Sequence, residues 1–182
     1  MRTPPGVKSV LERHRVHQLQ QAHETAAGEM LHAMRWCRSF LGPGPLVDPD
    51  EAAPMLREYV TTFYYAVIAE RPRQARVAVV IAGALALQIV VEGSAAAVSD
   101  RDMAYAAADR AAHCYPPERL STAHEGRVHL RNRHQQFEDA VAVGNRDKAL
   151  RAAFEIVAAA IRFASELPVQ QLGDHYAMEA MR

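Results

Sequence analysis

The sequence predicts an all-α fold, an irregular bundle of six or seven helices around one central apolar helix. Three observations predict it: apolar residues recur at steps of three and four in most segments, one uncharged run is long enough for a buried helix, and no partner strands are visible. The chain has 182 residues, of which 49% are hydrophobic and 23% charged, as in globular domains. We therefore expect a single helical domain over residues 1–182, with residues 1–6 as a flexible N-terminus.

The central element is the run Val77–Val91, which contains no charge and one polar side chain, Gln88. A membrane span needs about 20 apolar residues, and this run has 15, with charged residues closing it at both ends. Its length and its alanines favour a helix, although Val and Ile are common in strands. We expect a buried core helix over about residues 77–97. Gly83 indicates a close crossing of another helix, because glycine in a helix costs about 1 kcal/mol relative to alanine.

A long amphipathic helix is predicted over residues 7–41, ahead of a Gly/Pro-rich break. Its apolar stripe consists of Leu19, Ala22, Ala26, Met30, Ala33, Cys37 and Phe40. At 1.5 Å per residue this helix is about 50 Å long, more than a compact core needs. One prediction is therefore a homodimer through residues 7–41. Trp36 and Phe40 are candidate anchors of such an interface, because aromatic residues dominate interface energetics; the alternative is that they cover the domain's own core.

Two further helices flank the central run. The first is predicted from Asp48 to about residue 70, because an aspartate side chain can accept hydrogen bonds from the free amides of a first helical turn. The second is short and rich in alanine; it begins at Ser99 or Asp100 and ends at His113, before a pair of prolines.

The C-terminal third of the chain predicts two core helices and a terminal one. Thr122 and Glu125 have the spacing of a capping box, so one helix is expected over residues 122–143. Asn145 follows a glycine and can cap the next helix, which has a regular apolar stripe. Residues 168–182 are expected to form a loosely attached terminal helix.

Charge and cysteine content limit the classes of function. Lys plus Arg and Asp plus Glu number 21 each, so a bulk electrostatic attraction to nucleic acid or to an anionic membrane is not expected. Cys37 and Cys114 are the only cysteines, and neither has a zinc-site spacing. The chain opens without the apolar core of a signal peptide. We expect reduced thiols, a cytoplasmic location and no membrane contact.

The nine histidines suggest sites for a metal or a ligand. Asp109 and His113 are four residues apart, on one face of a helix. His134 lies on an apolar helix edge with Phe137 and Val141, where it is either a core residue hydrogen-bonded to a neighbour or a ligand. Neither the repeated Glu-x-x-His of di-iron bundles nor a nucleophile motif is present. We therefore expect no cofactor and no catalytic site.

Two stretches resemble a known family. One is the element Asp109-Arg-Ala-Ala-His113, and the other reads His134-x2-Phe137-x2-Ala140-Val141-x2-Gly144-Asn145-x3-Ala149. Together they resemble FCD-type ligand-binding domains, the effector domains of one class of GntR regulators. The resemblance implies that Asp109, His113 and His134 are ligands of a metal or of a carboxylate effector.

Basic residues gather in one later helix. Arg127 and Arg131 are one helical step apart and Arg133 is close by, an arrangement that can either follow phosphates or form a solvated face.

Three functional hypotheses follow. The first is a non-catalytic interaction or regulatory protein that acts through a helical surface or an apolar pocket, with a protein partner or a small apolar or carboxylate ligand. The second is a small-molecule or metal-binding effector domain around Asp109, His113 and His134, which gains support if Gln88 points at this group. The third is nucleic-acid binding through the arginines.

Overall fold

The computed structural model describes residues 5–41, 48–94, 98–113, 120 and 122–166, without the side chains of residues 5–13, 40 and 41. These residues form six α-helices and no strand: α1 (Pro5–Leu41), α2 (Pro49–Ile68), α3 (Pro72–Gly93), α4 (Asp100–Ala112), α5 (Ala123–Ala142) and α6 (Arg146–Glu166). The predicted all-α bundle is confirmed. The terminal helix predicted over residues 168–182 and the thiol of Cys114 lie outside the described residues.

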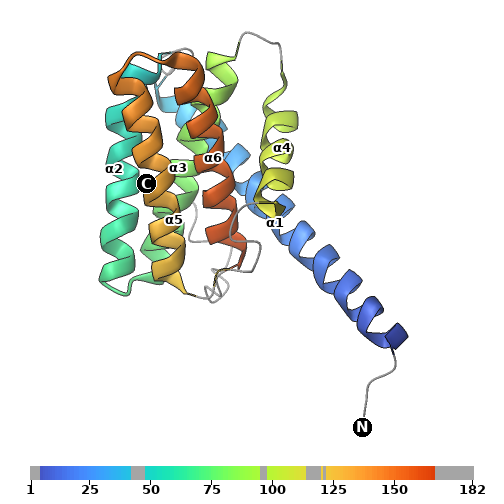
Figure 1. Cartoon of the computed structure of the whole chain (residues 1–182). Helices are drawn as coiled ribbons and strands as arrows, with labels where there is room; N and C mark the ends of the chain where they lie inside the picture. The colour runs from blue at the N-terminus through green and yellow to red at the C-terminus, as the bar shows by residue number, and fades with distance from the viewer. Residues whose placement is uncertain (1–4, 42–47, 95–97, 114–119, 121, 167–182) are drawn as a thin grey trace.

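Helix α3 lies at the centre of the bundle. It packs against α1, α2 and α6, while α5 packs between α2 and α6, and α4 covers α1 and α6 on the opposite side (Figure 1). The second half of α1 belongs to the bundle, but its first half extends away from the other described helices (Figure 1).

The central apolar helix is confirmed, with different bounds. Every residue from Ala78 to Val90 is buried. The helix starts at Pro72 rather than at residue 77, because the fixed φ of proline suits a first helical turn. It ends at Gly93 rather than at residue 97, and residues 95–97 lie outside the described part. Within that part, α3 alone is long and apolar enough to cross a membrane, and most of its apolar window is buried inside the bundle.

Gly83 marks the close crossing that the sequence indicated. A Cβ atom added at this position would lie 2.5 Å from the Met30 sulfur of α1 and 3.0 Å from the Ala160 Cβ of α6. Both distances are shorter than a normal van der Waals contact, so α3 approaches its two neighbours at a point where only glycine fits without rearrangement.

Side-chain caps begin four of the helices at the predicted positions. The capping oxygens belong to Asp48, Ser99, Thr122 and Asn145, which accept hydrogen bonds from the backbone amides of Asp50, Asp102, Glu125 and Lys148 at 3.0–3.1 Å. Each cap satisfies an amide that the helix itself leaves free. These contacts stabilise the first turns of α2, α4, α5 and α6.

Candidate functional site

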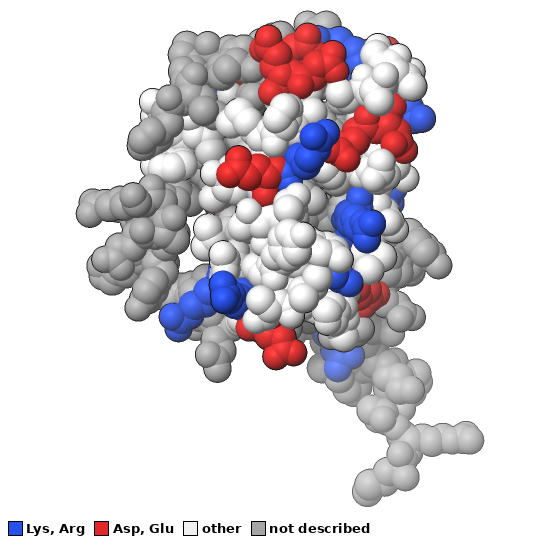
Figure 2. All heavy atoms as spheres, turned by 90° about the vertical axis from the view of Figure 1, so that its left-hand side faces the viewer, with Lys and Arg blue, Asp and Glu red and all other residues white. Residues whose placement is uncertain are grey.

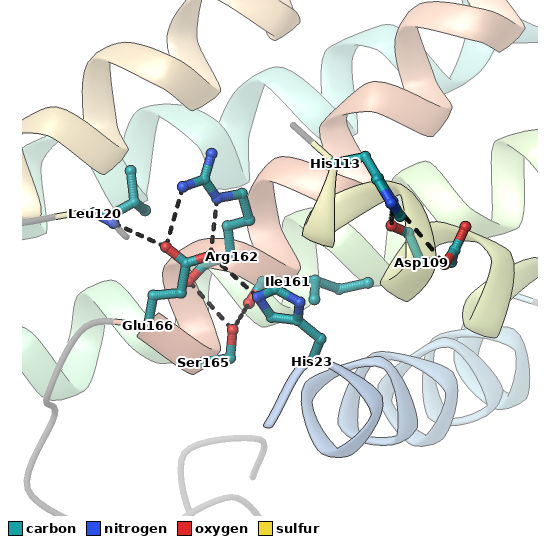
Figure 3. Close-up of polar contacts among 8 residues, drawn as sticks. All are labelled: His23, Asp109, His113, Leu120, Ile161, Arg162, Ser165 and Glu166. Atoms are coloured by element: carbon teal, nitrogen blue, oxygen red, sulfur yellow. Dashed lines mark hydrogen bonds and ion pairs between the residues drawn. The ribbon is translucent and has the colours of Figure 1, made fainter. Parts of the chain in front are cut away.

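The structure does not bring the predicted metal ligands together. Asp109 and His113 lie at the exposed end of α4, where the His113 Nδ1 atom is 2.8 Å from the backbone oxygen of Asp109 and 4.0 Å from its carboxylate (Figure 3). His134 lies in α5, on the other side of the bundle from α4 (Figure 1). Among the described residues no three His, Cys, Asp or Glu side chains could hold one metal ion. The ligand set implied by the FCD resemblance is therefore not assembled.

Gln88 does not reach His134 or Asp109. Its side-chain amide is fully buried in α3 and donates a hydrogen bond to Glu92 Oε1 at 2.9 Å. The same carboxylate accepts a bond from Arg38 of α1 at 3.1 Å, and Arg38 also donates to Asp100 of α4 at 2.6 Å. Gln88 thus belongs to a polar network that joins α1, α3 and α4, and we assign it a structural role.

Trp36 is half-buried and packs against the hydrophobic core. This position agrees with the alternative in which Trp36 covers the domain's own core. The side chain of Phe40 lies outside the described residues.

A buried ionic cluster lies where α6 meets α1 (Figure 3). The Glu166 carboxylate accepts hydrogen bonds from His23 Nε2 at 3.0 Å, from Arg162 at 2.8 Å and from the Leu120 backbone amide at 2.8 Å. His23 and Arg162 are only 1% and 2% exposed. Burial raises the pKa of Glu166, but the three hydrogen bonds outweigh it and lower the pKa to about 2. The cluster holds a fixed charge pair away from water, so we assign it to folding rather than to ligand binding.

The second concentration of polar side chains is a groove between α2 and α5, which run in opposite directions beside each other (Figure 1). The groove has a volume of about 200 Å³. Its lining combines an apolar floor with charged and polar walls: Arg57, Val60, Thr61, Phe63, Tyr64, Arg127, Arg131, His134, Gln135 and Glu138. We refer to it as the α2/α5 groove. It contains three residues that the sequence had indicated separately, Arg127, Arg131 and His134.

One end of the groove is positively charged. The guanidinium groups of Arg127 and Arg131 lie over the ring of Tyr64, with distances of 4.6 and 5.9 Å to the ring centre. Such stacking orients a guanidinium and leaves its N–H edge available to an acceptor. The Nε atom of Arg127 is buried and has no hydrogen-bond acceptor among the described residues. This end therefore offers two fixed cations without a carboxylate partner in the described chain.

The other end is nearly neutral. Arg57 donates a hydrogen bond to Glu138, so these two charges compensate each other. His134 lies beside them with a side chain that is 9% exposed, and its Nε2 atom is 3.8 Å from Glu138 Oε1. Burial lowers the pKa of His134, the charge of Glu138 raises it and the charge of Arg57 lowers it, with a net decrease. The imidazole is therefore neutral at physiological pH.

Sequence reasoning missed the half of the groove that α2 contributes. Arg57, Thr61 and Tyr64 are spaced by four and three residues and so share one face of that helix. This spacing can be seen in the sequence. A helix face that combines a basic, a hydroxyl and an aromatic side chain does not, however, indicate a binding site until its partner helix is known.

The comparisons with known proteins give no match. No protein-family model fits the chain, and no curated protein and no solved structure is significantly similar to it.

Proposed function

We propose that this chain is a non-catalytic, cytoplasmic regulatory protein that binds a small carboxylate in the α2/α5 groove. The observation that supports the proposal is the pair of guanidinium groups, Arg127 and Arg131, oriented over Tyr64 at the edge of a cavity. Five other arginines have carboxylate partners: Arg38, Arg57, Arg76, Arg110 and Arg162. Arg127 and Arg131 have none among the described residues, and a planar guanidinium is well suited to an external carboxylate, which it can bind with two parallel hydrogen bonds.

The groove favours a small ligand with an apolar body. Its volume of about 200 Å³ is below the range of about 300–1,000 Å³ that is common for drug-sized ligands. Val60 and Phe63 supply apolar surface at the floor, so an aliphatic or aromatic carboxylate would bury its apolar part there.

The distribution of surface charge favours a small anion over nucleic acid. Figure 2 shows the side of the molecule that lies to the left in Figure 1. Acidic side chains gather towards its upper end, and the basic ones are spread among uncharged and acidic residues (Figure 2). A protein that follows a phosphate backbone usually presents a continuous basic surface. Arg133, which the nucleic-acid hypothesis also used, bonds Gln136 and does not line the groove.

The lining residues also favour binding over catalysis. They include no Ser, Cys or Lys, and the hydroxyl groups of Thr61 and Tyr64 form no hydrogen bond with His134 Nε2 that would activate them as nucleophiles. Glu138 is engaged by Arg57, and His134 lacks a hydroxyl or thiol partner among the lining residues.

Calorimetric titration with hexanoate tests the proposal. We expect wild-type protein to bind hexanoate, and the double variant Arg127→Gln/Arg131→Gln to lose about tenfold or more in affinity, because hydrogen bonds to charged groups contribute about 1.5–3 kcal/mol. The control is Arg151→Gln, which removes one positive charge by the same substitution from an exposed position of α6 outside the groove. Hexanoate binding that survives the double substitution, or that Arg151→Gln abolishes equally, would contradict the proposal. Tighter binding of a short DNA duplex, with a steep salt dependence, would favour the nucleic-acid hypothesis instead.

A second candidate function is self-association through α1. Residues 14–22 are exposed or half-buried, and Val16 is 66% exposed. Val16 and Leu19 precede the buried residues His23 and Ala26 by seven positions each, so the face that packs into the bundle continues into the part of α1 that extends beyond it (Figure 1). We propose that a second copy of the chain packs against this continuation.

A further inference from the structure

The neutral end of the α2/α5 groove contains one buried polar atom without a partner in the described chain, beside a carboxylate that Arg57 engages. His134 Nε2 is buried and has no hydrogen-bond partner among the described residues. The nearest carboxylate oxygen, Glu138 Oε1, is 3.8 Å away, which is too far for a hydrogen bond. Buried polar atoms are normally hydrogen-bonded. A small polar group within reach of both residues would supply the contact that His134 lacks.

We propose that Glu138 and His134 select a ligand that carries a hydroxyl group at the end opposite its carboxylate. The inference rests on the proposed function, in which Arg127 and Arg131 hold the carboxylate. Glu138 is then the residue that determines which carboxylates bind, because it lies at the far end of the same groove.

A hydroxyl group matches the chemistry of this end. It has one donor and two acceptor positions, so it can donate to the Glu138 carboxylate and accept a bond from His134 in the tautomer that carries the proton on Nε2. A methyl group would leave His134 Nε2 without a partner. A second carboxylate or an ammonium group would lose its hydration here without a net attraction in return, because the charges of Arg57 and Glu138 compensate each other.

The length of the groove fixes the size of the ligand. Arg131 and Glu138 are seven residues apart in α5, which corresponds to about 10 Å along the helix axis. The probes are therefore acids of about six carbon atoms, a length of the same order as this spacing.

Three acids of equal length provide the test: hexanoate, its ω-hydroxy derivative and hexanedioate. We expect wild-type protein to bind the hydroxy acid about tenfold more tightly than hexanoate, because the added hydrogen bond has a charged acceptor. Hexanedioate should bind most weakly.

The variant Glu138→Gln should reverse this order. The substitution removes the negative charge and leaves Arg57 without its partner, so hexanedioate should become the tightest of the three ligands, and the advantage of the hydroxyl over the methyl group should fall. The matched control is Glu51→Gln, the same substitution at an exposed position near the start of α2 and outside the groove. It should keep the wild-type order. Circular dichroism and thermal unfolding of each variant establish that it is folded.

The outcomes distinguish the two proposals. Equal affinity for the three acids, or preference for hexanedioate in the wild type, overturns the inference about Glu138, while the proposed function stands if binding still requires Arg127 and Arg131. If no acid binds folded wild-type protein, the proposed function itself fails. Retention of the wild-type order by Glu138→Gln also overturns the inference.

Discussion

At the scale of single residues, the fold depends on a carboxylate that is shielded from water. Glu166 is held by His23, Arg162 and the Leu120 amide, and it joins α6 to α1 and to the chain just before α5. A buried ion pair contributes little to stability when it is compared with an apolar pair of similar size. Removing one partner, however, is strongly destabilising, because it leaves the other charge buried without compensation.

We predict that Glu166→Gln destabilises the protein by about 3–5 kcal/mol at neutral pH, because it removes one partner of the buried ion pair between Glu166 and Arg162. Urea unfolding followed by circular dichroism measures the difference. The control is Glu155→Gln, whose partner Arg110 is partly exposed, so that its loss should cost less than about 1 kcal/mol. If the two substitutions lower the free energy of unfolding equally, the burial of the Glu166 cluster adds nothing to the cost of losing an ion pair, and the prediction is wrong.

The same residue predicts a pH dependence. The pKa of Glu166 is about 2 in the folded protein and 4.5 by its ordinary value, so its contribution to stability is present above about pH 4.5 and is lost as the pH falls towards 2. Between pH 4.5 and pH 2 the free energy of unfolding of the wild type should fall by on the order of 3 kcal/mol more than that of Glu166→Gln, since the glutamine does not titrate. The measurement is urea unfolding of both proteins at several pH values. If the stabilities of the two proteins fall in parallel with pH, the lowered pKa of Glu166 is contradicted.

At the scale of helices, two C-terminal turns have the same backbone geometry with different residues. After α2, Glu70 has a φ of 52°, and the amide of Arg71 donates to the Ala66 oxygen at 2.8 Å. After α5, Gly144 has a φ of 64°, and the amide of Asn145 donates to the Ala140 oxygen at 2.9 Å. Both are Schellman motifs, in which a left-handed residue ends the helix and glycine is preferred. Glu70 therefore occupies a strained position.

Glu70→Gly should raise the free energy of unfolding by about 0.5–1 kcal/mol, because glycine adopts a positive φ without strain. Gly144→Ala should lower it by a similar amount; an added Cβ would meet no atom within 4 Å, so the cost lies in the backbone alone. Thermal and urea unfolding of both variants test the pair. A loss of stability in Glu70→Gly would mean that the glutamate side chain contributes more than its backbone conformation costs.

At the scale of the whole molecule, the extension of α1 beyond the bundle is the feature that a single copy of the described chain does not account for (Figure 1). A short helix without tertiary contacts is marginally stable in water, and packing against a second copy would bury Val16 and Leu19.

Sedimentation velocity should show a concentration-dependent dimer, and Leu19→Glu should make it monomeric by placing a charge on the shared face. Gln21→Glu introduces the same side chain at an exposed position two residues away, and we expect it to remain dimeric. A monomer at all concentrations would remove the proposal without affecting the α2/α5 groove, which lies on helices that do not include α1.

The sequence by itself determined the features that depend on near neighbours. Helix caps at Asp48, Ser99 and Thr122 involve contacts within three residues, so composition and spacing were enough to place them. The burial of Ala78 to Val90 in α3 followed from the lack of charge in the run Val77–Val91, and Gly83 indicated the close crossing because few other reasons favour glycine inside an apolar helix.

The tertiary structure alone decided which side chains meet. His23 and Glu166 are 143 residues apart, and no pattern in either helix indicates the other. Asp109 and His113 shared a predicted face but lie on α4, across the bundle from His134, so the expected ligand set was never assembled (Figure 1). Arg127 and Arg131 became a candidate site only when the antiparallel packing of α2 brought Tyr64 beneath them. Helix packing fixes these long-range neighbours, and it depends on the shape of whole faces rather than on the spacing within one segment.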